Sequence, residues 1–209
     1  MRQLFNDAIS LKHPRASRWF DHTHLFARKL DAGVISWLND QGSLTKRLMD
    51  YCPGQFSVRV LSQQWIRPQT EEAKLLAVPR HQLALLRQVQ LLCGDTVCVY
   101  ARSIIPLATL QGGHQRLKRL GNKPLGGYLF AQSNLKRSNQ HIARIIRKDP
   151  LFDIALPDAA QDCDQLWGRR SLFSMGKKSL LVSEFFLPAL FSEEQSELKL
   201  LQPKQIEKT

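Results

Sequence analysis

The chain has 209 residues, of which 43% are apolar and 23% are charged, a composition that excludes a disordered or fibrous protein. No run of about 18 apolar residues occurs, and polar residues interrupt the N-terminal segment, so we expect no membrane insertion and a cytoplasmic location. The length predicts one domain over residues 1–190, followed by a polar C-terminal tail over 191–209.

Positive charge is concentrated in the middle of the chain. Lysine and arginine number 30 against 18 acidic residues, a net charge of +12, and no acidic residue lies between Asp95 and Asp149. Such a field attracts nucleic acid, an acidic membrane surface or a small anionic metabolite, or it is an ordinary solvated basic face. Because the sequence has no recognisable nucleic-acid-binding motif and only 8% aromatic residues, we do not expect a nucleic-acid partner.

Helices are predicted first along the chain and strands afterwards. Asp31–Leu38 is expected to form a short helix, and Ser43 caps a second helix over 44–49. From Phe56 apolar and polar residues alternate, as in a half-buried strand. Segment 135–147 fits either a helix or a strand. Two hairpins with a glycine in the turn are predicted, 83–93 with 97–105 and 167–174 with 179–187. Antiparallel hairpins accompanied by helices predict the α+β class.

The cysteines and histidines do not form a metal-binding pattern. His22 and His24 are the only close histidine pair, and no second pair completes a zinc site. The cysteines are scattered, and reduced thiols are expected in a cytoplasmic protein, at Cys52, Cys93, Cys98 and Cys163. We therefore expect no metal.

Two charged residues interrupt the apolar faces of predicted strands. Arg87 is the single charge on a face with Leu85 and Val89, and Glu184 is the single acid on a face with Val182. An unpaired buried charge is costly, so each needs a partner. They pair with each other or emerge at a sheet edge, or they serve a ligand. In the ligand interpretation the arginine binds a carboxylate, and the glutamate accepts a hydrogen bond or acts as a general base.

Residues 120–128 form a glycine-rich loop motif. Gly121 and Gly126 have the spacing of a phosphate-binding loop, but Gly127-Tyr128 replace the required lysine and hydroxyl residue, which excludes that function. The glycines are instead expected to let the backbone approach a ligand or a neighbouring segment closely.

Trp167 opens a second dense motif, which continues through Arg169 and Arg170. We expect the tryptophan to anchor a hairpin beside two solvated arginines. An anion-binding turn is the alternative interpretation.

A series of short motifs is distributed over residues 37–137 and 166–188. The motifs are Trp37-Leu38, Ser43–Arg47, Leu86-Arg87, Leu91–Cys93, Ala101-Arg102 ahead of Pro106, Leu120–Phe130, Leu166–Ser171 and Leu180–Pro188. This ordered set resembles the chorismate lyase family. The resemblance implies a six-stranded antiparallel sheet with helices packed on it and helical flaps over an enclosed site. It also implies an activity without a cofactor, the release of pyruvate from chorismate to give 4-hydroxybenzoate at the start of ubiquinone synthesis.

The resemblance also implies binding roles for individual residues. Arg87 matches the arginine that binds the ring carboxylate, and Glu184 matches the glutamate that meets the 4-hydroxyl group. Leu44 and Leu125 match residues that contact the product through backbone groups. Arg102 matches another family arginine, for which we expect a contact with the enolpyruvyl carboxylate. The implied partners are chorismate and 4-hydroxybenzoate, and we expect a monomer.

Three regions depart from the family pattern: residues 1–30, an apparent insertion over 147–164 and the tail 191–209. One alternative function is a non-catalytic ligand-sensing domain, because some bacterial transcription regulators use the same fold. No N-terminal helix-turn-helix domain is evident, however, and the retained Glu184 favours an enzyme. The other alternative is a basic RNA-binding protein, which rests only on the charge of residues 96–148 and predicts salt-sensitive binding.

Overall fold

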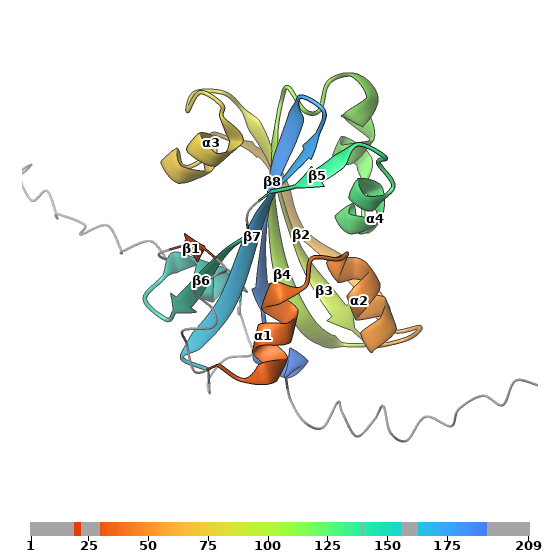
Figure 1. Cartoon of the computed structure of the whole chain (residues 1–209), viewed down its shortest axis with the longest axis vertical. Coiled ribbons are helices and arrows are strands. Elements are labelled where there is room, and N and C mark those ends of the chain that lie inside the picture. The colour runs from red at the N-terminus through yellow and green to blue at the C-terminus, as the bar shows by residue number, and fades with distance from the viewer. Residues whose placement is uncertain (1–18, 22–29, 139, 156–162, 192–209) are drawn as a thin grey trace, which may run out of the picture.

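The computed structural model describes residues 19–21, 30–138, 140–155 and 163–191 (Figure 1). The strands are β1 (Phe20–Asp21), β2 (Phe56–Ile66), β3 (Ala84–Cys93), β4 (Thr96–Pro106), β5 (Leu135–Arg137), β6 (His141–Ile146), β7 (Gln165–Met175) and β8 (Lys178–Phe186). The α-helices are α1 (Ala32–Asn39), α2 (Leu44–Tyr51), α3 (Thr70–Leu76), α4 (Leu125–Phe130) and α5 (Pro150–Ala155), and the 3₁₀ helices are η2 (Gly112–Arg119) and η3 (Pro188–Leu190).

One antiparallel sheet contains all these strands, in the order β1-β6-β7-β8-β4-β3-β2, with β5 paired to β7 beside this path. The α+β class is therefore confirmed, but the expected number of strands is wrong, since the described chain has eight and not six. The two additional strands are short: β1 has two residues and β5 has three. Segment 135–147 forms β5 and β6, because pairing with β7 decides between the helix and the strand that the local sequence allowed.

The local signals for helix starts and hairpin turns are confirmed. Asp31 caps α1 by accepting a hydrogen bond from the backbone of Gly33 at 2.7 Å, and Ser43 caps α2. In the turns of the two predicted hairpins, Gly94 has φ of 59° and Gly176 has φ of 62°. Residues other than glycine rarely adopt this left-handed backbone conformation, which explains the glycine at both positions.

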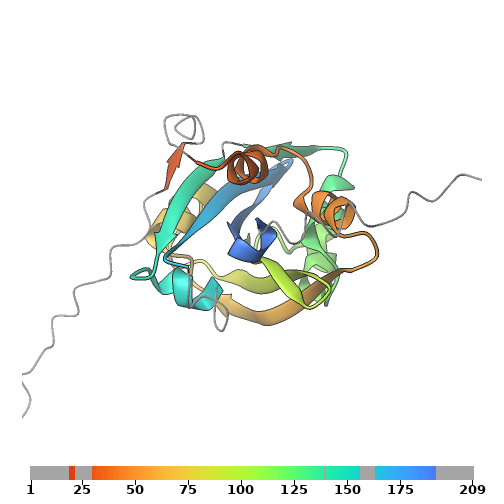
Figure 2. The ribbon, with the colours of Figure 1, turned by 90° about the horizontal axis from the view of Figure 1, so that it is seen from below.

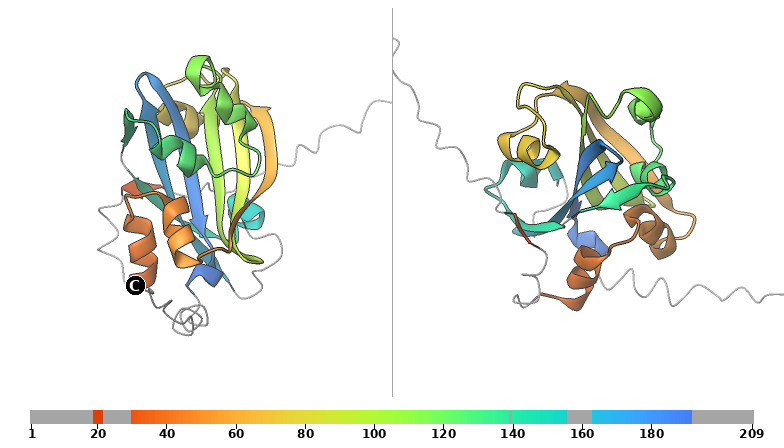
Figure 3. Two further views of the ribbon diagram at one scale, coloured as in Figure 1. Left: turned by 90° about the vertical axis from the view of Figure 1, so that its right-hand side faces the viewer. Right: turned by 45° about the horizontal axis from the view of Figure 1, so that its top comes forward.

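The sheet is curved (Figure 2). Arg87 and Glu184 lie on one of its faces, which we call the cavity face. It is covered by α1 and α2, whose Trp37 and Leu48 pack in one cluster with sheet residues such as Val89. Helices α2 and α4 lie against this same face (Figure 3, left). The cavity face therefore has a helical cover.

The opposite face, which we call the α3 face, has a different cover. Leu76 of α3 packs against Leu86 and Ile104 of the sheet, and Phe152 of α5 packs near Phe185. Because side chains alternate along a strand, neighbouring residues of β3, β4, β7 and β8 serve opposite faces.

A disulfide joins Cys52, just after α2, to Cys93 at the end of β3, with their Cα atoms 5.8 Å apart. The expectation of four reduced thiols is therefore wrong for these two residues. They are 41 residues apart in sequence, and only the packing of α2 on the sheet brings them together. Cys98 and Cys163 are free thiols, and burial raises the pKa of Cys98 to about 11.

The segments that depart from the family pattern are described only in part. Segment 147–164 contains α5, and its residues 156–162 lie outside the described residues, as do 1–18 and the tail from 192 onward. Within the described residues, no helix has the length and apolarity needed to cross a membrane.

Candidate functional site

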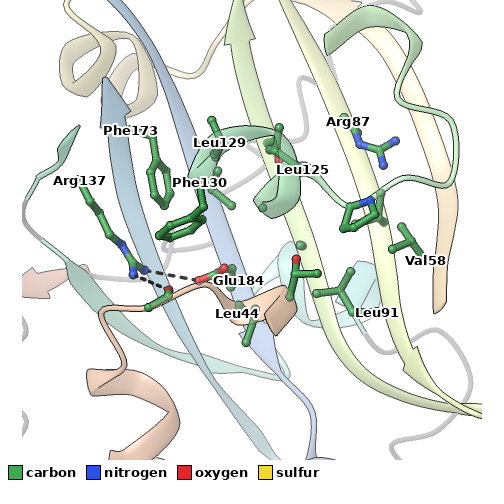
Figure 4. A pocket seen from close by; sticks show the side chains of 18 residues that line it. Leu44, Val58, Arg87, Leu91, Leu125, Leu129, Phe130, Arg137, Phe173 and Glu184 are labelled. Atoms are coloured by element: carbon green, nitrogen blue, oxygen red, sulfur yellow. Dashed lines mark hydrogen bonds and ion pairs between the residues drawn. The ribbon is translucent and has the colours of Figure 1, made fainter. Parts of the chain in front are cut away.

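A cavity of about 60 Å³ lies between the cavity face and the helices α2 and α4 (Figure 4). Apolar side chains make up most of its lining, including Val58, Val89, Leu91, Leu129, Phe130 and Phe173. A volume of this size holds only a few water molecules.

Arg87 lies in the cavity wall with an unsatisfied donor. The residue is 2% exposed. Its Nη2 donates to the backbone oxygen of Lys123 at 3.0 Å, whereas Nη1 is buried with no hydrogen-bond partner among the described residues. Burial lowers the pKa of this guanidinium from its ordinary value. Arg169 Nη2 and Arg170 Nε are also buried without a partner among the described residues, but of these three arginines only Arg87 lines the cavity. A cation with an unused donor at a cavity wall is able to bind an anion such as a carboxylate.

Glu184 stands at the other end of the cavity, beside Arg137 (Figure 4). Its Oε2 accepts a hydrogen bond from Arg169 Nε at 2.5 Å and lies 3.9 Å from Arg137 Nη2. Arg87 is not one of its partners, so the interpretation in which Arg87 and Glu184 pair with each other is wrong. The carboxylate is therefore held as part of a buried charge cluster at the cavity wall.

The expectation that Arg169 and Arg170 are solvated is wrong. Arg169 is 0% exposed, and its Nη1 donates to the backbone oxygens of Trp37 and Asp40, each at 2.8 Å. It thereby ties the C-terminal end of α1 to Glu184. Arg170 points to the α3 face, where it pairs with Glu71 at 3.0 Å, and Trp167 is buried in the core on the cavity face.

Leu44 and Leu125 both line the cavity, and each is the first residue of a helix. Backbone N–H groups in the first turn of a helix have no acceptor within the helix, so these positions can offer backbone donors to a ligand. The two helices also touch: a Cβ on Gly126 would lie 2.6 Å from Thr45 Oγ1. The expected close approach at Gly126 is thus to a neighbouring segment, and a larger residue there requires the side chain of Thr45 to shift.

Arg102 does not reach the cavity. Its neighbours Ala101 and Ser103 line the cavity, so the alternation of β4 turns Arg102 to the α3 face. There its Nη1 lies 2.6 Å from Oε1 of the buried Glu72. The structure therefore does not agree with the expected contact between Arg102 and a substrate carboxylate. The guanidinium of Arg102 lies on the α3 face, away from the cavity, and is already paired with the carboxylate of Glu72.

Arg137 is the cavity residue that the sequence did not reveal. It stands at the end of β5 and lines the cavity beside Glu184. Burial lowers the pKa of Arg137, Glu184 opposes this effect, and Arg169 reinforces it. Residue 137 fell in the segment for which helix and strand remained open, so no face could be assigned to it beforehand.

The fold and the site together define an α+β protein with a cavity between one face of its sheet and two helices, and the charged residues that line it are Arg87, Arg137 and Glu184. PhnF from Mycobacterium smegmatis shares the fold, with a TM-score of 0.52 at 12% identity over 72% of this chain and 66% of that chain. Residues 14–196 match the family model described as chorismate lyase. The chain therefore belongs to the chorismate lyase family.

Named relatives agree with this assignment. A protein of Methylococcus capsulatus named "Probable chorismate pyruvate-lyase" is 40% identical over 161 residues, which cover 77% of this chain and 98% of that protein. A protein of an Azoarcus species with the same name is 41% identical over 167 residues, 78% of this chain and 88% of that protein.

Proposed function

We propose that the protein is a chorismate pyruvate-lyase, which converts chorismate into 4-hydroxybenzoate and pyruvate by cleaving a carbon–oxygen bond. The observation that carries the proposal is the pair of polar groups at the two ends of an apolar cavity. Arg87 presents an unpartnered, buried Nη1 at one end, and Glu184 presents a carboxylate at the other. A ring with a carboxylate at one end and a hydroxyl group opposite fits this arrangement.

The strand register sets the separation of these two residues. Arg87 is paired with Ser103 across β3 and β4, and Glu184 is paired with Ala101 across β4 and β8. Two strand spacings and two residues along the strand place their Cα atoms about 12 Å apart. One ring can therefore lie between the two side chains, over the apolar floor of β4.

The reaction needs little chemical help from the protein, because it creates an aromatic ring. The C3–O bond breaks, and the electrons of the C4–H bond form the new ring double bond. The enolpyruvyl group leaves with the C3–O electrons and gains a proton on its methylene carbon, which yields pyruvate. The protein orients the arm and stabilises charge that develops on the ether oxygen. No cofactor takes part in this proposal.

Two routes exist for the C4 hydrogen. It passes directly to the methylene carbon within the substrate, or Glu184 accepts it and the methylene carbon is protonated separately. Chorismate that carries deuterium at C4 separates the routes. Direct transfer delivers the deuterium to the methyl group of pyruvate, whereas exchange at Glu184 delivers hydrogen from water.

We further propose that the protein acts in the cytoplasm as a monomer, at the first committed step of ubiquinone synthesis, with chorismate and 4-hydroxybenzoate as its partners. The net charge of +12 supports capture of a dianion such as chorismate.

The test is to mix purified protein with chorismate and to follow 4-hydroxybenzoate and pyruvate together. Equimolar appearance of both, lost in an Arg87→Ala variant, supports the lyase and connects it to this cavity. Tight binding of 4-hydroxybenzoate without turnover would replace the proposal with the ligand-sensing alternative. Absence of both binding and turnover would refute it.

A further inference from the structure

The proposed reaction gives a role to Arg87 and Glu184 in the cavity wall but not to Arg137. Among the described residues that line it, the cations are Arg87 and Arg137, and the anion is Glu184. Chorismate carries two carboxylates, and Arg87 accounts for the one on the ring. Arg137 stands at the other end of the cavity, beside Glu184 (Figure 4). A second cation is thus available where the proposed function has so far used only a carboxylate.

Among the described residues, the guanidinium of Arg137 is held by hydrogen bonds through Nε and Nη1, and the edge at Nη2 has no hydrogen-bond partner. Its Nε donates to Ser171 Oγ at 3.0 Å, and its Nη1 lies 3.3 Å from the backbone oxygen of Asp40 and 3.4 Å from that of Gly42. The group also lies over the ring of Phe173, 5.2 Å from its centroid. A planar group held in this way is pre-organised for a ligand.

The free edge is the Nη2 nitrogen. It lies 3.9 Å from Glu184 Oε2, which is an ion pair but too long for a hydrogen bond. Within the described part of the chain Nη2 has no other carboxylate partner. Since Glu184 already accepts a hydrogen bond from Arg169, Arg137 can give its Nη2 donors to a ligand without leaving Glu184 unpaired.

We propose, on the basis of the function proposed above, that Arg137 binds the carboxylate on the enolpyruvyl arm of the substrate. The ring carboxylate and the 4-hydroxyl group stand at opposite ends of the ring, at Arg87 and Glu184 respectively. The arm is attached to C3, next to the carbon that carries the hydroxyl group. Its carboxylate therefore lies at the Glu184 end, where Arg137 supplies the opposite charge and screens the arm from that glutamate.

This role distinguishes substrate from product. 4-Hydroxybenzoate keeps the ring carboxylate and the hydroxyl group but has lost the arm. Arg137 therefore contributes to the binding of chorismate and contributes little to the binding of 4-hydroxybenzoate. Arg137 is thus a specificity-determining residue for the dianion.

The direct test uses two unreactive ring compounds that differ by one carboxylate, 3-methoxybenzoate and 3-(carboxymethoxy)benzoate. For the parent protein we expect the second compound to bind about tenfold or more tightly than the first, because a hydrogen-bonded ion pair is added. In Arg137→Gln this advantage is lost. Lys136→Gln removes the same charge from the exposed neighbour in β5 and retains the advantage.

The kinetic test compares the same variants on chorismate. In Arg137→Gln we expect kcat/KM to fall about 30-fold or more, while the Kd of 4-hydroxybenzoate stays within about threefold of the parent value. Equal losses in both quantities would overturn the proposal, because Arg137 would then act only by holding the segment around Asp40 and Gly42. Unchanged kcat/KM would overturn it as well.

Two further points keep the test decisive. If Arg137→Gln does not fold, Arg137→Lys replaces it, since lysine keeps the charge but lacks the fixed fork, and the same loss of preference for the dicarboxylate is expected. If the parent protein does not convert chorismate, the proposed function fails. The comparison of the two unreactive compounds then still decides whether Arg137 recognises a second carboxylate.

Discussion

Arg87 on the cavity face differs from the arginines of the α3 face in having no carboxylate partner among the described residues. On the α3 face, helix α3 supplies carboxylates to the strands, Glu72 to Arg102 and Glu71 to Arg170. On the cavity face Arg169 is paired with Glu184, whereas Arg87, which is 2% exposed, has no carboxylate within ion-pair distance among the described residues. Burial of an unpaired charge is costly, so the α3 face has the arrangement expected for stability. The cavity face keeps the arrangement expected for a site whose missing anion is the ligand.

The largest effect is expected at the charge cluster of the cavity face. Glu184→Gln removes the counter-charge of Arg169 and Arg137 and the acceptor for the 4-hydroxyl group. We expect kcat to fall about 1,000-fold, within the range for loss of a group that acts on the reacting atoms. Steady-state pyruvate release measures it. Turnover at the parent rate would show that Glu184 is not essential.

The α3 face is expected to respond in stability and not in turnover. Arg102→Leu leaves Glu72, which is 7% exposed, without its partner, and we expect the free energy of unfolding to fall by about 3 kcal/mol. Urea denaturation measures this. Adding Glu72→Leu should restore most of the loss, and kcat/KM should stay within about threefold of the parent value for both variants. A large loss of kcat/KM in an Arg102→Leu variant that remains folded would show that Arg102 takes part in substrate binding or catalysis.

Arg87→Ala tests the unpaired arginine. We expect the Kd of 4-hydroxybenzoate to rise about 100-fold, because the variant removes a charged, buried donor from the carboxylate. Titration calorimetry measures the affinity, with Arg102→Leu as the control that loses an arginine from the other face. Binding as tight as in the parent would exclude Arg87 as the carboxylate ligand.

The cover of the cavity face is expected to be sensitive to a single methyl group. Gly126→Ala places a Cβ 2.6 Å from Thr45 Oγ1, and we expect a loss of about 1–2 kcal/mol in the free energy of unfolding. Gly127→Ala is the matched control, because its Cβ would meet nothing within 4 Å. Equal effects of the two variants would disprove the close contact between α2 and α4.

The smallest effect concerns the thiols. The protein has four cysteines, so protein unfolded without reductant should show two reactive thiols, Cys98 and Cys163, and four after reduction. In the folded state Cys98 should react slowly, because a pKa of about 11 instead of 9.0 lowers its thiolate fraction near neutral pH about 100-fold. Four thiols before reduction would exclude the Cys52–Cys93 bond.

Much of the cavity face could be predicted, because strand alternation is local. Arg87 and Glu184 stood out as single charges on apolar faces, and both line the cavity. The same alternation excludes Arg102, once Ala101 is known to face inward. Resemblance alone placed Arg102 in the site, and it did not say which way the side chain points.

The parts that could not be predicted depend on distant partners. Arg169 is buried because it donates to the backbone of Trp37, 132 residues away in sequence. Arg137 acquires its face only when β5 pairs with β7. Cys52 and Cys93 meet only when α2 packs on the sheet. Local patterns carry no information on such contacts, which arise from tertiary packing.

The contact between Gly126 and Thr45 has a consequence for timing. Because α2 and α4 are in close contact there, a movement of either helix away from the cavity also disturbs the packing of the other. If a ligand enters and leaves by separation of these helices from the sheet, each turnover needs at least one such opening, and turnover cannot exceed the opening frequency.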